Sequence, residues 1–144
     1  MFERVLLCQD GSDAGRVALK RGAELAIYLN AKVFVLSIVS DAAFDAASNA
    51  LSLGYACVVN SEVEYRRSLE ESVERLKARG VEAEGFLARG NTIDTIVEYS
   101  KRLSIDLIVV GHYPKPAGGR WWSGPERAAL AERVSCSVLI AIGQ

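Results

Sequence analysis

Apolar runs alternate with helical patterns along the chain, and this alternation predicts its elements. A short apolar run over residues 4–8 ends at the turn-forming residues 9–12 (QDGS). Continuous apolar runs of this length are typical of strands buried on both faces. Residues 81–88 alternate between apolar and polar positions instead, which predicts a strand at the edge of the sheet. Three further continuous runs predict strands over residues 32–39, 106–111 and 137–142.

Helical spacing fills the intervals between the strands. Residues 13–30 place Val17, Ala18, Gly22, Leu25, Ala26 and Leu29 on one face, and Asn30 is a residue type that commonly ends a helix. Residues 61–64 (SEVE) match a capping box, which predicts a helix from Ser61 to Arg79. Asn91 and Pro125 are expected to begin two shorter helices, with Pro125 at the first helical position.

Residues 41–60 are rich in Ala, Ser and Asn and show no clear period. We expect a long surface connection with about one helical turn. Connections of this length are either binding loops or mobile linkers, and the pattern does not choose between them.

The order of strands and helices predicts an α/β fold in a single domain, residues 1–144. Strands that alternate with helices form a parallel sheet through right-handed crossovers, with helices on both faces. An open five-stranded sheet wound in the order 3-2-1-4-5 reverses its direction between strands one and four. Ligands bind such sheets at the carboxyl edge, beside that reversal. The predicted crevice lies between the segments 9–12 and 111–124.

The net charge, the apolar runs and the cysteines of the chain limit its expected binding partners and cellular compartment. The net charge is −1, which gives no electrostatic reason to expect nucleic acid or an anionic membrane as a partner. The sequence has neither a signal-peptide pattern nor the roughly 18 apolar residues of a membrane span. We therefore expect a cytoplasmic protein. The three cysteines, Cys8, Cys57 and Cys136, form no Cys-x-x-Cys pair, and we expect buried thiols rather than a disulfide framework or a zinc site.

Candidate chemistry is sparse. No Gly-x-Gly-x-x-Gly, P-loop or Cys/His metal set occurs, so a metabolic enzyme is the weakest hypothesis. His112 is the sole histidine, and without a nucleophile–base pair it is expected to be a solvated loop residue. Trp121 and Trp122 either divide between the core and a cleft or partner surface, or both fill a loop.

Several segments resemble the universal stress protein family. They are residues 8–12 (CQDGS), 106–111 (DLIVVG), 131–134 (AERV) and 135–140 (SCSVLI). With the element order, the resemblance covers nearly the whole chain. It implies an adenine nucleotide alpha hydrolase-like, Rossmann-like fold and a regulatory function in the stress response.

ATP-binding members of that family carry a Gly-x2-Gly-x9-Gly-Ser/Thr loop after the fourth strand. Here Gly111 and Gly124 match, but Pro114 and Pro125 replace the other two positions. Proline lacks the backbone N–H group that would donate a hydrogen bond to a phosphate, so these replacements weaken an ATP site. The resemblance leaves any metal undefined. It implies a degenerate adenine-nucleotide site formed by Gln9, Asp10, Gly11, Ser12, Val39, Gly111, His112, Gly124 and Pro125.

Two functions remain open on the residues alone. One is a nucleotide-binding regulator with at most a slow ATPase activity, and Asp10 would contact the adenine end. The other is an adaptor that binds no nucleotide and acts through an unidentified protein partner. The resemblance implies homodimers paired edge to edge through the last strand, over residues 138–142. An apolar edge strand from Val138 to Ile142 would favour such pairing.

Overall fold

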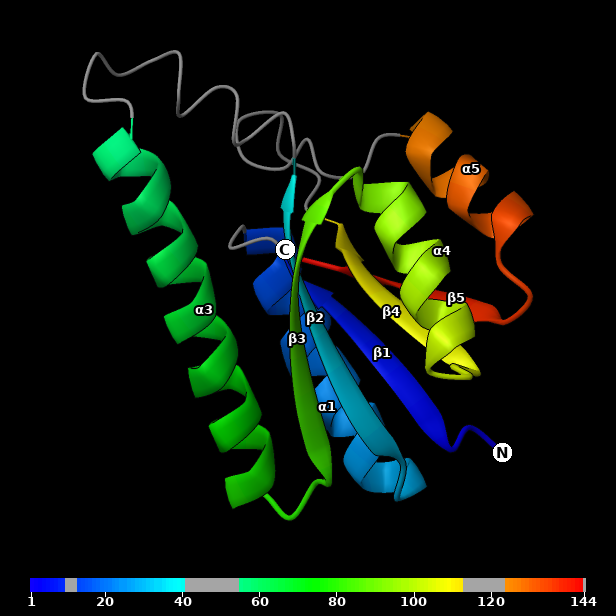
Figure 1. Ribbon diagram of the computed structural model, residues 1–144. Helices are drawn as coiled ribbons and strands as arrows, with labels where there is room; N and C mark the ends of the chain where they lie inside the picture. The colour runs from blue at the N-terminus through cyan, green and yellow to red at the C-terminus, as the bar shows by residue number, and fades with distance from the viewer. Residues whose placement is uncertain (10–12, 41–54, 113–123, 144) are drawn as a thin grey trace.

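The computed structural model describes residues 1–9, 13–40, 55–112 and 124–143 (Figure 1). Within these residues strands and helices alternate, as the sequence pattern predicts. The strands are β1 (Arg4–Gln9), β2 (Lys32–Ser40), β3 (Ala83–Gly90), β4 (Leu107–His112) and β5 (Ser137–Ile142). The helices are α1 (Asp13–Leu29), α3 (Tyr55–Ala78), α4 (Thr92–Arg102) and α5 (Gly124–Arg133).

All five strands are parallel and belong to one sheet in the order β3-β2-β1-β4-β5. This confirms the predicted fold class and strand order. Helices α1 and α3 cover one face of the sheet, and α4 and α5 cover the other (Figure 1). The central strand β1 therefore lies between β2 and β4, where the winding reverses.

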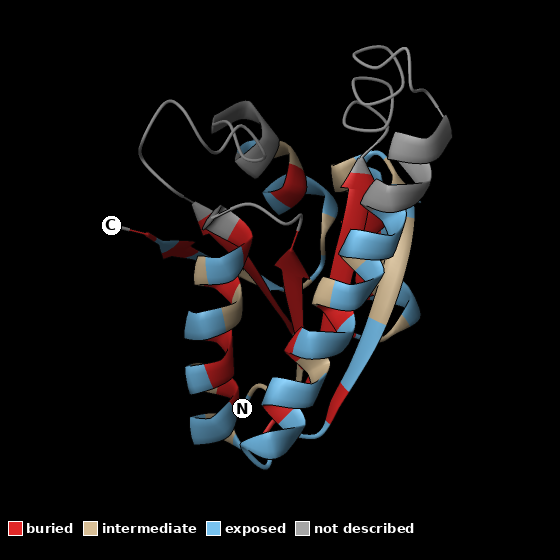
Figure 2. Cartoon of the chain, turned by 90° about the vertical axis from the view of Figure 1, so that its left-hand side faces the viewer, coloured by how far each residue is buried: buried red, intermediate tan, exposed pale blue. Residues whose placement is uncertain are grey.

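The core has two layers because the central strands are buried on both faces. Leu7 and Val35 pack toward α1 and α3, whereas Leu6 and Leu36 pack toward α4 and α5. Figure 2 views the α1 and α3 side, where buried residues turn toward the sheet and exposed residues turn outward. Strand β3 is half-buried or exposed at every residue except Ala83, as predicted for an edge strand.

Two helix ends follow the sequence prediction closely. Asn30 takes a left-handed conformation, with φ of 53°, directly after α1. At α4 the Oδ1 atom of Asn91 accepts a hydrogen bond from the backbone N–H of Asp94 at 3.0 Å. Both residues satisfy backbone groups that the helix itself leaves unpaired.

The predicted start of α3 is wrong. The helix begins at Tyr55, so Ser61 lies inside it and does not cap it. A capping box favours a helix start but does not prevent upstream residues from joining the helix. Residues 55–60 (YACVVN) contain no Gly or Pro that would stop it. The predicted connection over 41–60 is shortened accordingly, and residues 41–54 lie outside the described part.

Smaller shifts affect the boundaries of other elements. Strand β3 begins two residues later than expected, and β4 begins one residue later. Helix α5 begins at Gly124, so Pro125 is its second residue and not its first. Boundary differences of this size are common because helix and strand ends fray.

Close packing of α1 on β1 depends on a glycine. A Cβ atom added at Gly22 would lie 2.2 Å from Cδ2 of Leu7, which is fully buried. The missing side chain therefore lets the helix approach the strand. This explains why Gly22 lies on the inward face of α1 despite the low helix propensity of glycine.

Candidate functional site

The carboxyl ends of β1 and β4 lie beside each other at the centre of the sheet. Leu7 of β1 is level with Val109 of β4, and continuing this register brings Gln9 level with Gly111. The carboxylate of Asp106 fixes the alignment at the opposite end, because it accepts hydrogen bonds from the backbone N–H groups of Glu3 (2.8 Å) and Arg4 (3.1 Å). The segments that follow Gln9 and His112 therefore leave the same edge from neighbouring strands.

The structure describes part of the predicted binding set. Gln9 and Val39 are buried near the ends of β1 and β2. Gly111 is buried in β4 beside Ala141, and the backbone of His112 ends that strand. Gly124 and Pro125 are the first two residues of α5. The nucleotide contacts assigned to these residues stay predictions.

Other predicted residues cannot be placed. Asp10, Gly11 and Ser12 lie outside the described residues, as do Pro114, Trp121 and Trp122. The side chain of His112 is also outside the described part. The described part of the predicted crevice consists of the strand ends and the start of α5.

A buried polar cluster lies directly beneath this edge, on the side of α1 and α3. It consists of Gln9, Ser37 and Ser72, which are each no more than 3 % exposed. Gln9 and Ser37 are direct partners across β1 and β2. Ser72 Oγ donates to the carbonyl oxygen of Ser68 at 2.9 Å and lies 3.3 Å from Gln9 Oε1.

The cluster reaches the surface through an arginine. Arg75 Nη2 donates to Ser72 Oγ at 3.4 Å, so a chain of polar contacts runs from exposed Arg75 to the end of β1. Ser37 Oγ forms no hydrogen bond within the described part of the chain. A buried hydroxyl group without a hydrogen-bond partner lowers the stability of the folded state, so this cluster differs from an ordinary hydrophobic core.

The sequence analysis missed Ser37 and Ser72. Ser37 interrupts the apolar run of β2, and Ser72 falls among Leu69, Val73 and Leu76 on the inward face of α3. A polar residue at a position that periodicity assigns to the core was the available signal.

The described thiols are poorly suited to nucleophilic chemistry. Burial raises the pKa of the Cys8 thiol far above its ordinary value. The pKa of Cys136 is also raised, by partial burial and by the negative charge of Asp106. Cys8 is fully buried as expected, whereas Cys136 is only partly buried, because it precedes the exposed edge strand β5. The side chain of Cys57 lies outside the described part.

Two further kinds of feature are missing from the described residues. No helix there is both long enough and apolar enough to cross a membrane. In the same ranges, no group of three or more His, Cys, Asp or Glu residues could hold a metal ion.

Comparison with known proteins identifies related chains. The model of the universal stress protein family matches residues 1–141. The universal stress protein YxiE of Bacillus subtilis (strain 168) is 27% identical over 97% of this chain and 99% of its own length. A solved universal stress protein in complex with cAMP is 27% identical, covers 96% of both chains and superposes with a TM-score of 0.63.

A further solved structure shares the fold at lower identity. A universal stress protein family protein from Arabidopsis thaliana, with AMP bound, is 17% identical. The match covers 99% of this chain and 92% of that chain, with a TM-score of 0.67. Similarity over the full length of both chains places the same elements in the same order.

Proposed function

The chain belongs to the universal stress protein family, and we propose that it binds an adenine nucleotide at the carboxyl edge of its sheet, between β1 and β4. The proposed unit is a single domain, residues 1–144. The bound nucleotide would serve a regulatory role in the stress response, in the cytoplasm. The cAMP-bound and AMP-bound relatives support this class of ligand.

One observation carries the proposal. Strands β1 and β4 are parallel neighbours at the point where the winding of the sheet reverses. In open parallel sheets this position is where ligands bind. Only three residues separate the end of β1 from the start of α1, so the N-terminus of this helix lies near the same edge. Backbone N–H groups at a helix N-terminus favour an anionic group.

The proposed contacts divide between the two ends of the ligand. Asp10 would accept a hydrogen bond from the base or the ribose, with Gln9, Gly11 and Ser12 shaping the turn. Val39 is 7 % exposed at the end of β2, and it offers an apolar surface to the base. On the phosphate side, the backbone of Gly111, His112, Gly124 and Pro125 would border the ligand.

The phosphate side is the weaker half of the site. Pro114 removes one backbone donor from the loop after β4, and Pro125 removes another from the first turn of α5. The usual hydroxyl is also absent at position 125. We therefore propose that nucleoside monophosphates, including cyclic ones, bind at least as tightly as ATP. The relatives crystallised with cAMP and AMP are consistent with this preference.

Calorimetric titration with AMP and ATP tests both parts of the proposal. We expect AMP to bind with an affinity equal to or higher than that of ATP. Replacing Pro114 by Gly and Pro125 by Ser restores two phosphate donors, each worth about 1.5–3 kcal/mol when charge-assisted. The double variant should therefore bind ATP at least about tenfold more tightly, while AMP affinity changes much less.

Asp10→Ala provides the control at the other end of the ligand. It should weaken AMP and ATP by the same factor, because both share the adenosine group. Absence of binding heat with both nucleotides at millimolar concentration would overturn the proposal. The non-binding adaptor would then be the better description.

We also propose that the protein forms a homodimer through β5. Leu139, Ile140 and Ile142 are 38%, 37% and 54% exposed on this edge strand. Exposed apolar edge strands pair readily with another strand. Light scattering at micromolar concentration should give twice the chain mass, and Ile140→Lys should reduce it. A monomeric mass for the unaltered chain would contradict the dimer.

A further inference from the structure

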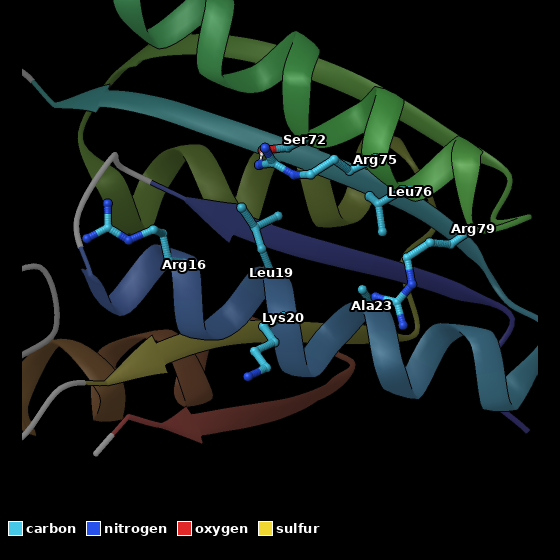
Figure 3. Close-up of a pocket in the computed structure, with 8 residues that line it drawn as sticks. All are labelled: Arg16, Leu19, Lys20, Ala23, Ser72, Arg75, Leu76 and Arg79. Atoms are coloured by element: carbon cyan, nitrogen blue, oxygen red, sulfur yellow. Dashed lines mark hydrogen bonds between the residues drawn. The ribbon is translucent and has the colours of Figure 1, made fainter.

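A groove of about 290 Å³ lies between α1 and α3, on one face of the sheet. Its walls come from these two helices and from Arg79 directly after α3, and Figure 3 shows the side chains that line it. Pockets that hold small molecules begin at about this volume. The lining residues are Arg16, Leu19, Lys20 and Ala23 of α1, Ser72, Arg75 and Leu76 of α3, and Arg79, which directly follows α3.

The floor of the groove is apolar. Ala23 and Leu76 are each 4 % exposed and belong to the core cluster beneath α1 and α3, and Leu19 packs against that cluster. In Figure 3, Leu19 points from α1 toward α3, and Leu76 points back toward α1. An apolar body placed here would lose contact with water without covering a polar group of the floor.

The rim carries only positive charge. Arg16, Lys20, Arg75 and Arg79 are all exposed, and none of the eight lining residues is acidic. Lys20 and Arg79 form no ion pair with any described residue. This is unusual for a chain whose net charge is −1.

Cations elsewhere on α3 behave differently. Arg67 pairs with Glu64, and Lys77 lies 3.9 Å from the carboxylate of Glu74. These residues share α3 with Arg75 but do not line the groove. Acidic partners are thus supplied to these two cations but, among the described residues, not to Lys20, Arg75 or Arg79, which leaves this part of the rim complementary to an anion.

A second feature distinguishes the groove from an ordinary gap between helices. Ser72 lines it and is 3 % exposed, and it joins Arg75 to Gln9 through contacts of 3.4 and 3.3 Å. One end of the groove therefore offers a cation held by a buried hydroxyl. Such a combination suits the head group of a ligand whose body lies on the apolar floor.

We propose that this groove binds one small amphipathic anion. Its apolar body would lie on Leu19, Ala23 and Leu76, and its carboxylate or phosphate head would bind Arg75 and Arg79. The volume equals that of about ten water-sized groups, which limits the body to a chain of roughly ten carbons. A nucleotide is a poor match, because the floor offers no polar group to pair with the edge of a base.

The test is a titration of the full chain with decanoate and with decyl phosphate, below their micelle-forming concentrations. We expect saturable binding of one molecule per chain, and whichever head group binds more tightly identifies the natural chemistry. Decanol and inorganic phosphate, which each carry half of the ligand, should bind at least about tenfold more weakly. Methyl resonances of Leu19 and Leu76 should shift during the titration.

A matched pair of double variants isolates the charge of the groove. Arg75→Gln with Arg79→Gln should weaken binding of the amphiphile at least about tenfold. Arg67→Gln with Lys77→Gln removes the same charge from α3 outside the groove, and it should change the affinity less than twofold. Thermal unfolding followed by circular dichroism confirms that each variant is folded.

Four results would overturn the proposal. The two double variants could weaken binding equally, which would indicate a general charge effect. Decanol could bind as well as decanoate, or AMP could displace decanoate from the same methyl groups. Finally, the Arg75 and Arg79 variants could change the mass of the unliganded protein, which would make a second copy the occupant. Failure of nucleotide binding at the carboxyl edge would leave the proposal intact, because the two titrations use different ligands.

Discussion

Buried hydroxyl groups have different hydrogen-bond partners on the two faces of the sheet. On the α4 and α5 side, Thr95 Oγ1 donates to the carbonyl oxygen of Asn91 at 2.6 Å, and Ser100 Oγ donates to that of Val97 at 2.8 Å. Each hydroxyl is satisfied by its own helix or its cap. On the α1 and α3 side, Ser72 also donates within its own helix, to the carbonyl oxygen of Ser68, but it in addition contacts the distant Gln9, and Ser37 has no partner among the described residues.

This difference suggests that the α4 and α5 layer mainly stabilises the fold, whereas the polar cluster on the other face lies near the proposed binding sites. A hydroxyl that bonds within its own helix adds little specificity and fits an apolar layer, as around Ile96, Ile108 and Leu130. Polar groups that join separate elements restrict how those elements sit and are costly to leave half-satisfied. On the α1 and α3 side, the incompletely hydrogen-bonded cluster of Gln9, Ser37 and Ser72 lies beside the strand end where we place the nucleotide. It also lies beneath the groove that is lined by cations.

The largest effect should come from the apolar face. Ile108→Ala removes a fully buried side chain at the centre of the α4 and α5 layer. The lost burial and the resulting cavity should lower the free energy of unfolding by about 2–5 kcal/mol. Urea denaturation measures this change directly. A loss under about 1 kcal/mol would show that this layer is loosely packed and would weaken the contrast between the faces.

An intermediate effect is expected where α1 approaches β1. Gly22→Ala places a Cβ atom 2.2 Å from Leu7 Cδ2, and Leu7 is fully buried in the core. Overpacking costs about 1–3 kcal/mol, which outweighs the gain of up to about 1 kcal/mol from the better helix propensity of alanine.

A double-mutant cycle with Leu7→Ala provides the control for this contact. The shorter side chain makes room for the new methyl group, so the two changes should be less harmful together than their sum. Additive losses in urea denaturation would mean that the helix does not rest on Leu7 in solution.

The smallest effects concern the polar cluster, and they should differ in sign. Ser72→Ala removes the link from α3 to Gln9 and should cost about 1 kcal/mol. Ser37→Ala removes a buried hydroxyl that has no described partner, so stability should stay the same or rise by up to about 1 kcal/mol. Thermal unfolding of the two variants in parallel checks this. Equal destabilisation would mean that Ser37 is hydrogen-bonded after all.

Much of the fold follows from the sequence because its signals are local. The continuous apolar runs of β1, β2 and β4 predict strands buried on both faces, and the alternation of strands and helices then predicts a parallel sheet. The order 3-2-1-4-5 needs the further assumption that the winding reverses at strand one. Asn30 and Asn91 end and begin their helices as expected, since capping depends on the residue itself and a few neighbours.

The remaining features depend on residues far apart in the chain. The start of α3 was missed because residues 55–60 could join the helix ahead of a valid capping box. Ser72 and Gln9 are 63 positions apart, and only the fold brings them together. The basic groove likewise needs two helices side by side, so neither helix reveals it through its own period.

The central claim is that an adenine nucleotide binds where β1 and β4 end. Amide resonances of an isotope-labelled chain, followed during titration with AMP, test it most directly. We predict that the largest shifts fall at the ends of these strands, on Gln9, Gly111 and His112, and on Gly124 at the start of α5. Amides along the α1 and α3 groove, such as those of Ala23 and Arg79, should move little. Shifts confined to that groove, or no shifts at millimolar AMP, would contradict the account.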